Sequence, residues 1–468
     1  MDRVRTGREG RTEGRESGMK RRVALMAIVA SFAMLTAACT AGGGTDEPPP
    51  SIDPNAEHDP VTLEMWIPFS ADHEVAGVQA TFDAFEAEYP WITMKVTTGV
   101  EDDAKVLAAI RAGTPPDATM SWQLDDLPAF CETGAWQDLT PYIEQDGMDL
   151  SSTFPASVER YTGFGGKRCA FPFLTDAVGL YYNKDLLEAK GFTEPPKTYS
   201  ELTAMAKDLT EFNADGSIKV AGFVPWFGNY YVNGDPLNHS IAWDADWYND
   251  DGTAAMATDP DWAAMFRWQK DLVDWYGVDN LKKFVAGQGD EWGESSQDFQ
   301  NGRIAMALDG EWRTAFIKNG TPDLNYGTAP SPVPDGKEDL YGIGRVGGTI
   351  IGIPRGSAHE AEAWLLVKFM ATNTDSLVAA ANAIGNVPTT FDALESPDLA
   401  LPEQFDAFLQ IFSDPDSHYK DMSVLGSADQ DLLSSFAAKW QSGRITDLEA
   451  GLADVAQQID DQLAQAGG

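Results

Sequence analysis

Residues 170–202 constrain the fold more than any other part of this 468-residue chain. Their first part alternates and is rich in Phe, Val, Leu and Tyr, which predicts a buried strand. Asn183 then begins a helix, Gly191 ends it, and Pro195 with Pro196 rules out its continuation before a new helix follows. We interpret this succession of strand, helix, turn and helix as the place where the chain leaves one lobe and enters another.

The chain before this crossing alternates between strand and helix patterns. Strand patterns at 61–67 and 91–96 are separated by a long helix, and a second helix at 103–111 precedes a strand at 117–122. This order predicts an α/β lobe with a largely parallel sheet, in which ligands bind beyond the carboxyl ends of the strands. Three loops follow strands and are therefore candidates for a binding site: residues 68–74, 122–126 and 175–177.

Six stretches along the chain carry a resemblance to a known family. They read FDAFEAEYPWITMKV (82–96), AAIRAGTPPDATM (108–120), LTPYI (139–143), YNKDLLEAKGF followed by PPKTYSEL (182–202), FQNGRIAMALDGEW (299–312) and GGTIIGIPRGSAHEAEAWLLVKFM (347–370). With these stretches the chain resembles the extracellular solute-binding proteins of ABC importers, which include the maltose-binding and other oligosaccharide-binding proteins. The resemblance implies an α/β fold of the type II periplasmic-binding-protein class, with two discontinuous lobes joined by a hinge.

The length of the chain also favours two lobes. Roughly 400 residues follow the N-terminal segments, which is more than a single hydrophobic core usually contains. We expect lobe 1 to comprise residues 61–176 and about 347–400, and lobe 2 to comprise residues 177–346 and about 401–468. The chain would then cross between the lobes more than once.

Residues 1–38 have the features of an export signal. Three consecutive basic residues precede an apolar run of 16 residues, shorter than the roughly 20 residues of a membrane-spanning helix, and Cys39 follows. Translation can also start at Met19. We expect a lipid on Cys39 that anchors the protein at the outer face of the cell membrane, with ordinary cleavage as the alternative. Residues 39–60 are rich in Gly, Pro, Asp and Glu, which predicts a flexible tether.

The charge and the cysteines exclude some partners. A formal net charge of −40 repels phosphate backbones, so we expect no nucleic-acid partner. Besides Cys39 there are two cysteines, Cys131 and Cys169, and in an exported chain we expect them to form a disulfide, the alternative being two buried thiols. These two cysteines and the five His residues have no metal-ligand spacing, so no metal site is expected.

Two aromatic–carboxylate pairs suit a sugar. A sugar presents apolar C–H faces and a rim of hydroxyls, so its site needs flat rings beside polar groups. Trp122 with Asp125, and Glu311 with Trp312, supply such pairs. They fall where the resembled family places sugar-stacking and rim residues, and Asp176 matches a family carboxylate at the crossing.

Six further residues are candidates for ligand contact: Asp72, Trp226, Asn229, Tyr230, Arg345 and Gly348. Trp226 and Tyr230 lie in an aromatic segment interrupted by Gly and Asn. Gly348 follows Arg345 in a segment where small residues let the backbone approach a ligand, and a hinge crossing explains this glycine equally well. For Asp72, as for Asp125, the alternative role is a helix N-cap.

Three tryptophans are expected to be packing residues. Trp262, Trp268 and Trp275 recur at near-helical spacing together with Met265 and Leu272. This spacing predicts a helix that packs into a core, and these rings are therefore not expected to contact ligand.

The resemblance implies a monomeric, lipid-anchored binding protein that passes a sugar, most simply an oligosaccharide, to the permease subunits of an ABC transporter, without a cofactor and without covalent chemistry. One alternative is a secreted carbohydrate-active hydrolase, because paired carboxylates beside Trp residues also suit glycosidic cleavage. No Asp or Glu pair, however, has a local setting that singles out an acid and a nucleophile. A second alternative is the same fold binding a phosphorylated polyol or a peptide, which the scarcity of basic groups other than Arg345 in the candidate loops disfavours.

Overall fold

The structure, a computed structural model, describes residues 49–228, 234–289, 292–293 and 295–466. The predicted signal segment with Cys39, and the candidates Asn229 and Tyr230, lie outside these residues. Contacts divide the chain into two units, Met1–Glu47 and Pro48–Gly468, and the described residues belong to the second.

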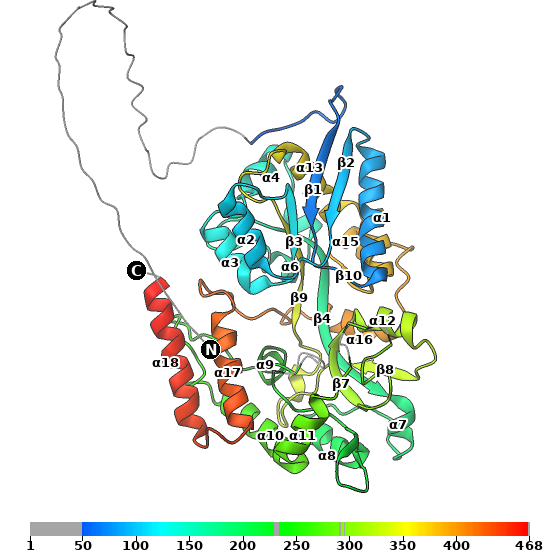
Figure 1. Ribbon diagram of the computed structural model, residues 1–468, viewed down its shortest axis with the longest axis vertical. Helices are drawn as coiled ribbons and strands as arrows, with labels where there is room; N and C mark the ends of the chain where they lie inside the picture. Colours follow the sequence, from blue (N-terminus) through cyan, green and yellow to red (C-terminus); the bar gives the residue numbers. More distant parts are fainter. Residues whose placement is uncertain (1–48, 229–233, 290–291, 294, 467–468) are drawn as a thin grey trace, which may run out of the picture. The chain divides into compact units, whose positions relative to one another are not determined.

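One large sheet and a set of helices make up the described fold (Figure 1). The strands of the sheet are β1 (Val61–Trp66), β2 (Ile92–Thr97), β3 (Ala118–Ser121), β4 (Phe171–Asn183), β7 (Met306–Gly310), β8 (Tyr326–Ala329), β9 (Val346–Gly352) and β10 (Val387–Pro388). A separate pair is formed by β5 (Glu211–Phe212) and β6 (Ile218–Val220). The helices before residue 250 are α1 (Asp72–Glu88), α2 (Asp103–Ala112), η1 (Leu124–Asp126), α3 (Leu127–Glu132), α4 (Thr140–Asp146), α5 (Leu150–Thr153), α6 (Ala156–Glu159), α7 (Lys184–Glu188), α8 (Tyr199–Leu209) and α9 (Pro236–Trp243). The later helices are α10 (Pro260–Tyr276), α11 (Val278–Val285), α12 (Arg313–Gly320), η3 (Glu338–Leu340), α13 (Glu360–Thr372), α14 (Thr374–Ile384), α15 (Phe391–Leu394), η4 (Glu403–Phe405), α16 (Asp406–Ser413), α17 (Ala428–Gln441) and α18 (Leu448–Ala466).

The sheet is mixed, and the prediction of a largely parallel sheet is only partly correct. Its main order is β10-β4-β9-β3-β1-β2, and β7 and β8 pair with β4. The local strand–helix–strand units make β1 parallel to β2 and to β3, as their order predicts. β9 is antiparallel to both β3 and β4 because it returns from a distant part of the chain, which the local pattern cannot reveal.

The predicted crossing between lobes is strand β4. Its residues 171–177 pair with β9, and its residues 178–183 pair with β7 and β8. In Figure 1, β4 and β9 run from the region of β1–β3 towards the region of β7 and β8. One long strand therefore belongs to two groups of strands, and the fold is the expected two-lobed α/β fold.

Capping residues set the helix boundaries after β4, and Asn183 is the predicted one among them. The Asn183 side chain caps α7 by accepting a hydrogen bond of 3.0 Å from the Leu186 amide. Thr198 is the N-cap of α8. Its hydroxyl accepts a hydrogen bond from the Glu201 amide, and the Glu201 carboxylate accepts one from the Thr198 amide, which together form a capping box. The chain turns after α7 at Gly191, whose φ of 85° is unfavourable for any residue with a Cβ.

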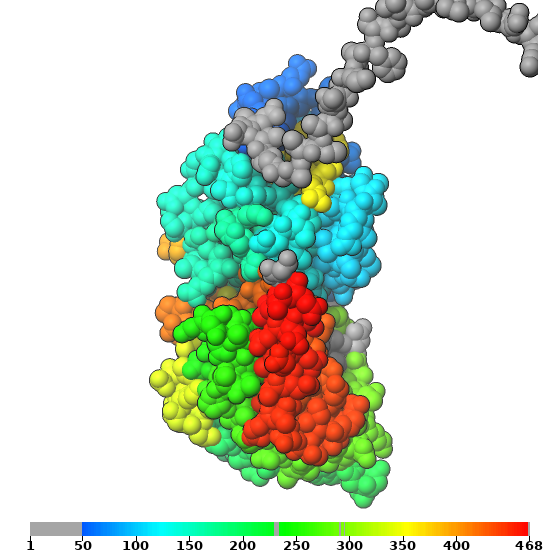
Figure 2. Space-filling model, turned by 90° about the vertical axis from the view of Figure 1, so that its left-hand side faces the viewer, coloured from blue at the N-terminus to red at the C-terminus, as the bar shows by residue number. Residues whose placement is uncertain are grey.

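Helices cover the sheet and extend beyond it. Figure 1 shows α1 on one side of the strands β1–β3 and the helices α2 and α3 on the other. The helices α17 and α18 pack side by side, and their outer faces form part of the surface shown in red in Figure 2. Among the described residues, no helix combines the length and the apolar character that crossing a membrane requires.

Helix α10 buries one stripe of residues, and one of its tryptophans lies outside it. Trp262 is fully buried, and Trp268 is half-buried against other aromatic rings, as predicted. Trp275 is 39% exposed and contacts Phe212, so its prediction as a core residue is wrong. At 100° per residue, Trp275 points about 140° away from Trp262, whereas Leu272 stays on the buried stripe.

The predicted disulfide joins Cys131 to Cys169. Cys131 lies in α3 and Cys169 directly precedes the entry to β4. The Cα atoms are 5.6 Å apart, and both residues are buried. The bond therefore closes the loop that leads from the first strands to the crossing strand.

Candidate functional site

A cavity of about 500 Å³ lies beyond the carboxyl ends of β1 and β3. The segments that follow these two strands supply Phe69, Glu74, Trp122, Gln123 and Asp125. The rest of its lining comprises Glu101, Asp176, Gly228, Asp235, Leu237, Trp292, Trp312, Arg345, Thr349, Asn386, Tyr419 and Gln430. All three loops that the strand order suggested contribute at least one of these residues.

Five of the candidates chosen from the sequence lie in this lining: Trp122, Asp125, Asp176, Trp312 and Arg345. The first two follow β3, and Asp176 lies in β4 at the crossing. Trp312 directly precedes α12, and Arg345 directly precedes β9. The fold thus brings together residues that are up to 223 positions apart in the sequence.

Three other described candidates lie elsewhere. Asp72 is exposed in the first turn of α1. Trp226 is half-buried, and the Lys282 ammonium lies 5.9 Å from the centre of its ring. Gly348 lies in β9, where a Cβ atom would stand 2.4 Å from the Leu174 carbonyl oxygen. The close approach of β4 therefore accounts for this glycine without a ligand.

Trp312 is held in the cavity wall by the glycine two residues before it. The Trp312 ring is 8% exposed and lies directly against Gly310. A Cβ atom at Gly310 would stand 2.0 to 2.3 Å from the ring carbons of Trp312, so no other residue leaves room for the ring in this position. Among the described residues, the Trp312 indole N–H has no hydrogen-bond partner.

A second aromatic wall is formed by Trp122 and Trp292. Their rings are nearly parallel, with an interplanar angle of 18° and centroids 6.3 Å apart. Phe69 contacts the Trp122 ring edge-on, with centroids 5.8 Å apart. These contacts fix the orientation of Trp122 and leave aromatic surface at the cavity.

Asp125 is tied to residues from the C-terminal part of the chain. Its carboxylate accepts a hydrogen bond of 2.6 Å from the Tyr419 hydroxyl and another from the Gln430 side chain. Asp125 does not cap a helix, because Asp126 is the residue that precedes α3. The N-cap alternative for Asp125 is thereby excluded, and its carboxylate is part of the cavity wall.

At one end of the cavity, two carboxyl groups share one amide, and only one of them, Asp176, lines the cavity. The Asn386 side-chain nitrogen donates hydrogen bonds to Asp176 Oδ1 at 2.5 Å and to Glu311 Oε1 at 2.8 Å. Glu311 is fully buried, and its Oε2 accepts a hydrogen bond of 2.7 Å from the Ala177 amide. Glu311 thus connects the start of α12 with the crossing point of β4 and reaches the cavity only through its neighbours.

Burial raises the pKa values of the carboxyl groups at this end of the cavity. Burial, followed by repulsion from Asp176, raises the pKa of Glu311 well above its usual range. Burial raises the pKa of Asp176 to about 6, although the nearby Arg345 lowers it. Burial also raises the pKa of Glu74 to about 7, although hydrogen bonds from the backbone before α1 lower it. These groups hold their protons more tightly than they do in the unfolded chain.

We expect the melting temperature to rise as the pH is lowered from 8 to 5.5. A carboxyl group with a raised folded-state pKa contributes stability that is complete below its unfolded pKa of about 4 and is lost as the pH rises through its folded pKa. For Asp176 and Glu74 that loss lies around pH 6 to 7. Replacing Asp176 by Asn keeps the acceptor for Asn386 and should flatten the dependence. A melting temperature that falls over this range, or an unchanged slope in the variant, would contradict the assignment.

The cavity also contains residues that were not predicted as ligand contacts. Glu74 and Gln123 lie within the candidate loops 68–74 and 122–126, so the strand order indicated their position. Asn386 directly precedes β10, and nothing local marks it as part of a site. Trp292 and Tyr419 come from segments without apolar periodicity, and only the tertiary fold brings them to the cavity.

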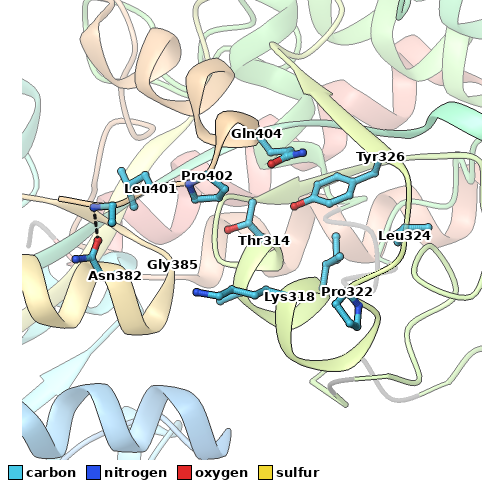
Figure 3. A pocket seen from close by; sticks show the side chains of 13 residues that line it. Thr314, Lys318, Pro322, Leu324, Tyr326, Asn382, Gly385, Leu401, Pro402 and Gln404 are labelled. Carbon is cyan, nitrogen blue, oxygen red and sulfur yellow. Dashed lines mark hydrogen bonds between the residues drawn. The ribbon is translucent and has the colours of Figure 1, made fainter. Parts of the chain in front are cut away.

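A second cavity, of about 250 Å³, has a different composition. Figure 3 shows its lining, in which Lys318 and Tyr326 lie beside apolar residues such as Pro322, and Asn382 accepts a hydrogen bond from the Ala400 amide. The described lining contains neither a tryptophan nor a carboxylate. Across the described part of the chain, no group of three His, Cys, Asp or Glu side chains is placed to hold a metal ion.

Comparison with known proteins gives two curated relatives that bind sugars. The chain is 26% identical over 295 residues to the maltotriose-binding protein of Pyrococcus abyssi, which covers 62% of this chain and 58% of that protein. It is 26% identical over 258 residues to the maltooligosaccharide ABC transporter solute-binding lipoprotein of Streptococcus pneumoniae, which covers 53% of this chain and 54% of the relative. The chain thus spans less than two thirds of the length of these relatives.

Solved structures match more of the chain. The structure of CpMnBP1 with mannotriose bound has a TM-score of 0.74 and 26% identity, and the match covers 85% of this chain and 99% of that one. Maltose-bound MalE3 of T. maritima has a TM-score of 0.70 at 22% identity, which supports the fold alone. Residues 80–407, most of the chain, match the family described as bacterial extracellular solute-binding protein. The protein therefore belongs to the family of bacterial extracellular solute-binding proteins.

Proposed function

We propose that this protein binds a carbohydrate, most simply an oligosaccharide, outside the cytoplasm and delivers it to the permease of an ABC importer. The observation that carries this proposal is a cavity that combines flat rings with polar groups. Trp122, Trp292 and Trp312 offer faces for the C–H surfaces of sugar rings. The side chains of Gln123 and Asn386 also line the cavity and carry polar groups for sugar hydroxyls.

The charge of the cavity supports a neutral ligand. Its described lining contains one cationic side chain, Arg345, and five carboxyl groups, those of Glu74, Glu101, Asp125, Asp176 and Asp235. A phosphorylated polyol or another anionic solute would meet repulsion from this lining. The sugars bound by the maltotriose-binding relative and by CpMnBP1 support the same ligand class.

We further propose that the protein performs no covalent chemistry. A glycoside hydrolase places an acid and a nucleophile or base on either side of the scissile bond. Asp176 and Glu311 instead accept hydrogen bonds from one and the same Asn386 nitrogen, and Glu311 does not line the cavity. This pair is therefore not arranged to flank a glycosidic bond. The relatives found are likewise binding proteins.

A thermal-shift screen of the purified protein tests the ligand class. Maltotriose, mannotriose and other mono- and oligosaccharides serve as probes, with a phosphorylated polyol and a peptide as comparison. A sugar at about 100 times its dissociation constant should stabilise the protein by roughly 2.7 kcal/mol. Stabilisation by the phosphorylated polyol or the peptide, with none by any sugar, would overturn the proposal.

We propose that a monomer closes around the sugar by a hinge motion of two lobes. Lobe 1 would comprise residues 61–176 and about 347–400, and lobe 2 residues 177–346 and about 401–468. Strand β4 supports the boundary between residues 176 and 177, because its first half pairs with β9 and its second half with β7 and β8. Small-angle scattering with and without sugar tests the motion, and an unchanged radius of gyration on saturation would count against it.

We propose that a lipid on Cys39 anchors the protein at the outer face of the cell membrane. The basic residues and the short apolar run before Cys39 support this, and one relative is described as a lipoprotein. Replacing Cys39 by Ala should release the protein into the medium or leave it unprocessed. Fractionation and mass spectrometry measure both outcomes. Unchanged membrane retention and mobility of the variant would contradict lipidation.

A further inference from the structure

A lysine is completely buried beside the cavity wall. The side chain of Lys420 is 0% exposed, and its ammonium lies 2.8 Å from Asp125 Oδ1 and 2.9 Å from Asp429 Oδ2. The Trp247 ring covers it, with the ammonium 4.8 Å from the ring centre. Lys420 itself does not line the cavity, whereas Asp125 does.

The ion pairs of Lys420 connect two distant segments of the chain. Asp125 lies in η1, which follows β3 after two residues, and Asp429 lies in the first turn of α17. Two residues next to Lys420 and Asp429 in the sequence also bind Asp125. The Tyr419 hydroxyl and the Gln430 side chain each donate a hydrogen bond to its carboxylate. Residues 418–430 therefore hold the Asp125 carboxylate from several sides.

The backbone is adapted to this contact. The loop between Lys420 and Asp429 contains Gly426, which has a φ of 62°. A Cβ atom there would stand 3.3 Å from the Asp125 carbonyl oxygen, which shows that the two segments approach each other closely at this glycine. Asp429 is fixed in turn by a hydrogen bond of 2.5 Å from the Tyr248 hydroxyl.

Such an arrangement is weak evidence for a role in stability alone. Burying two carboxylates and an ammonium is unfavourable, and a well-packed apolar cluster of the same volume is often as stable or more stable. What a buried ion pair provides is a defined geometry for its members. Here one member is a carboxylate of the ligand cavity, and the residues on both sides of the contact, Tyr419 and Gln430, also line that cavity.

We propose that Lys420 is a positioning residue for ligand binding: it fixes the Asp125 carboxylate in the cavity wall and holds residues 418–430 against the turn after β3. The sugar then contacts a cavity wall formed by residues of both the turn after β3 and residues 418–430. Without Lys420, Asp125 and Asp429 repel each other and the segments separate, so the cavity loses Tyr419 and Gln430 as neighbours of Asp125. This inference rests on the proposed sugar-binding function.

The test compares two lysines that each contact two aspartates. Lys337 lies 2.7 Å from Asp261 and 3.5 Å from Asp244, and none of these three residues lines the cavity. Replacing Lys420 by Met should weaken the binding of whichever probe the wild type binds, maltotriose or mannotriose, at least 10-fold. Replacing Lys337 by Met should lower the melting temperature and leave that affinity within a factor of about two. Replacing Lys420 by Arg, which keeps the charge, should restore at least part of the lost affinity.

The outcomes separate this inference from the function on which it rests. If the wild type binds a probe and Lys420→Met binds it equally well, the positioning role is wrong and the sugar-binding function stands. Should Lys420→Met not fold, Asp125→Asn replaces it in the test. This variant removes the charge that Lys420 pairs with and keeps an acceptor oxygen for Tyr419 and Gln430. Unchanged affinity of Asp125→Asn overturns the inference. A wild type that binds no saccharide overturns both.

Discussion

Replacing Trp312 by Ala is expected to weaken sugar binding by about 2 kcal/mol or more, which is roughly a 30-fold loss of affinity. The Trp312 ring is 8% exposed in the cavity wall, and its indole N–H has no partner among the described residues. Truncation removes the aromatic face that this ring presents to the cavity. Calorimetric titration with the best saccharide of the screen measures the effect.

Two further variants separate a binding role from a packing role. Replacing Gly310 by Ala inserts a methyl group where the Trp312 ring lies, so it should also lower affinity while every polar group of the site remains. Trp268 serves as the control, because it packs against Tyr199 and donates a hydrogen bond to Thr203 away from the cavity. Its replacement by Ala should lower stability by about 3 kcal/mol and leave affinity near normal. If Trp312→Ala melts early but binds normally, Trp312 is a core residue.

Removing the disulfide is expected to lower the free energy of unfolding by about 3 to 4 kcal/mol. Cys131 and Cys169 are 38 residues apart, and a loop of this length restricts the unfolded chain by about that amount in the chain-entropy model. The variant with both cysteines replaced by Ala is compared with the wild type by chemical denaturation. Mass spectrometry without reduction checks the bond itself, and two freely alkylated thiols in the native protein would contradict it.

The crossing between lobes could be predicted from the sequence because its signals are local. The helix start at Asn183 and the helix end at Gly191 each depend on a few neighbouring residues, and both have the predicted role in the structure. The antiparallel pairing of β9 could not be predicted in this way. It depends on a strand that follows β4 by more than 160 residues, and no local pattern encodes its direction.

The candidate site was predictable where it depends on the ends of strands. Trp122 and Asp176 lie at the cavity because a strand ends or crosses there, and the rule for open α/β sheets selects such positions. Trp226 was chosen for its aromatic, Gly-rich surroundings, yet the fold packs it beside Lys282. Trp292 and Tyr419 complete the cavity from segments whose sequence carries no periodic signal. Side-chain partners across such distances follow from the tertiary fold alone.

The buried carboxyl group of Glu311 also shows that contacts set by the tertiary fold cannot be predicted from neighbouring residues in the sequence. The pair of Glu311 and Trp312 in the sequence suggested that both contact a sugar. In the structure Glu311 does not line the cavity, and its carboxylate accepts hydrogen bonds from Asn386 and from the Ala177 amide. Neighbouring residues at the start of a helix point in different directions, so a sequence pair does not guarantee a shared surface. Glu311 therefore supports the crossing strand, and Trp312 faces the cavity.

Isothermal titration calorimetry of the purified protein with mannotriose and maltotriose, followed by analysis of the recovered sugar, tests the central claim most directly. We predict saturable binding of at least one of these sugars at one site per chain, with the sugar recovered unchanged. The absence of heat and of thermal stabilisation with every saccharide of the panel would contradict a sugar-binding function, and the appearance of shorter sugars would show a hydrolase instead.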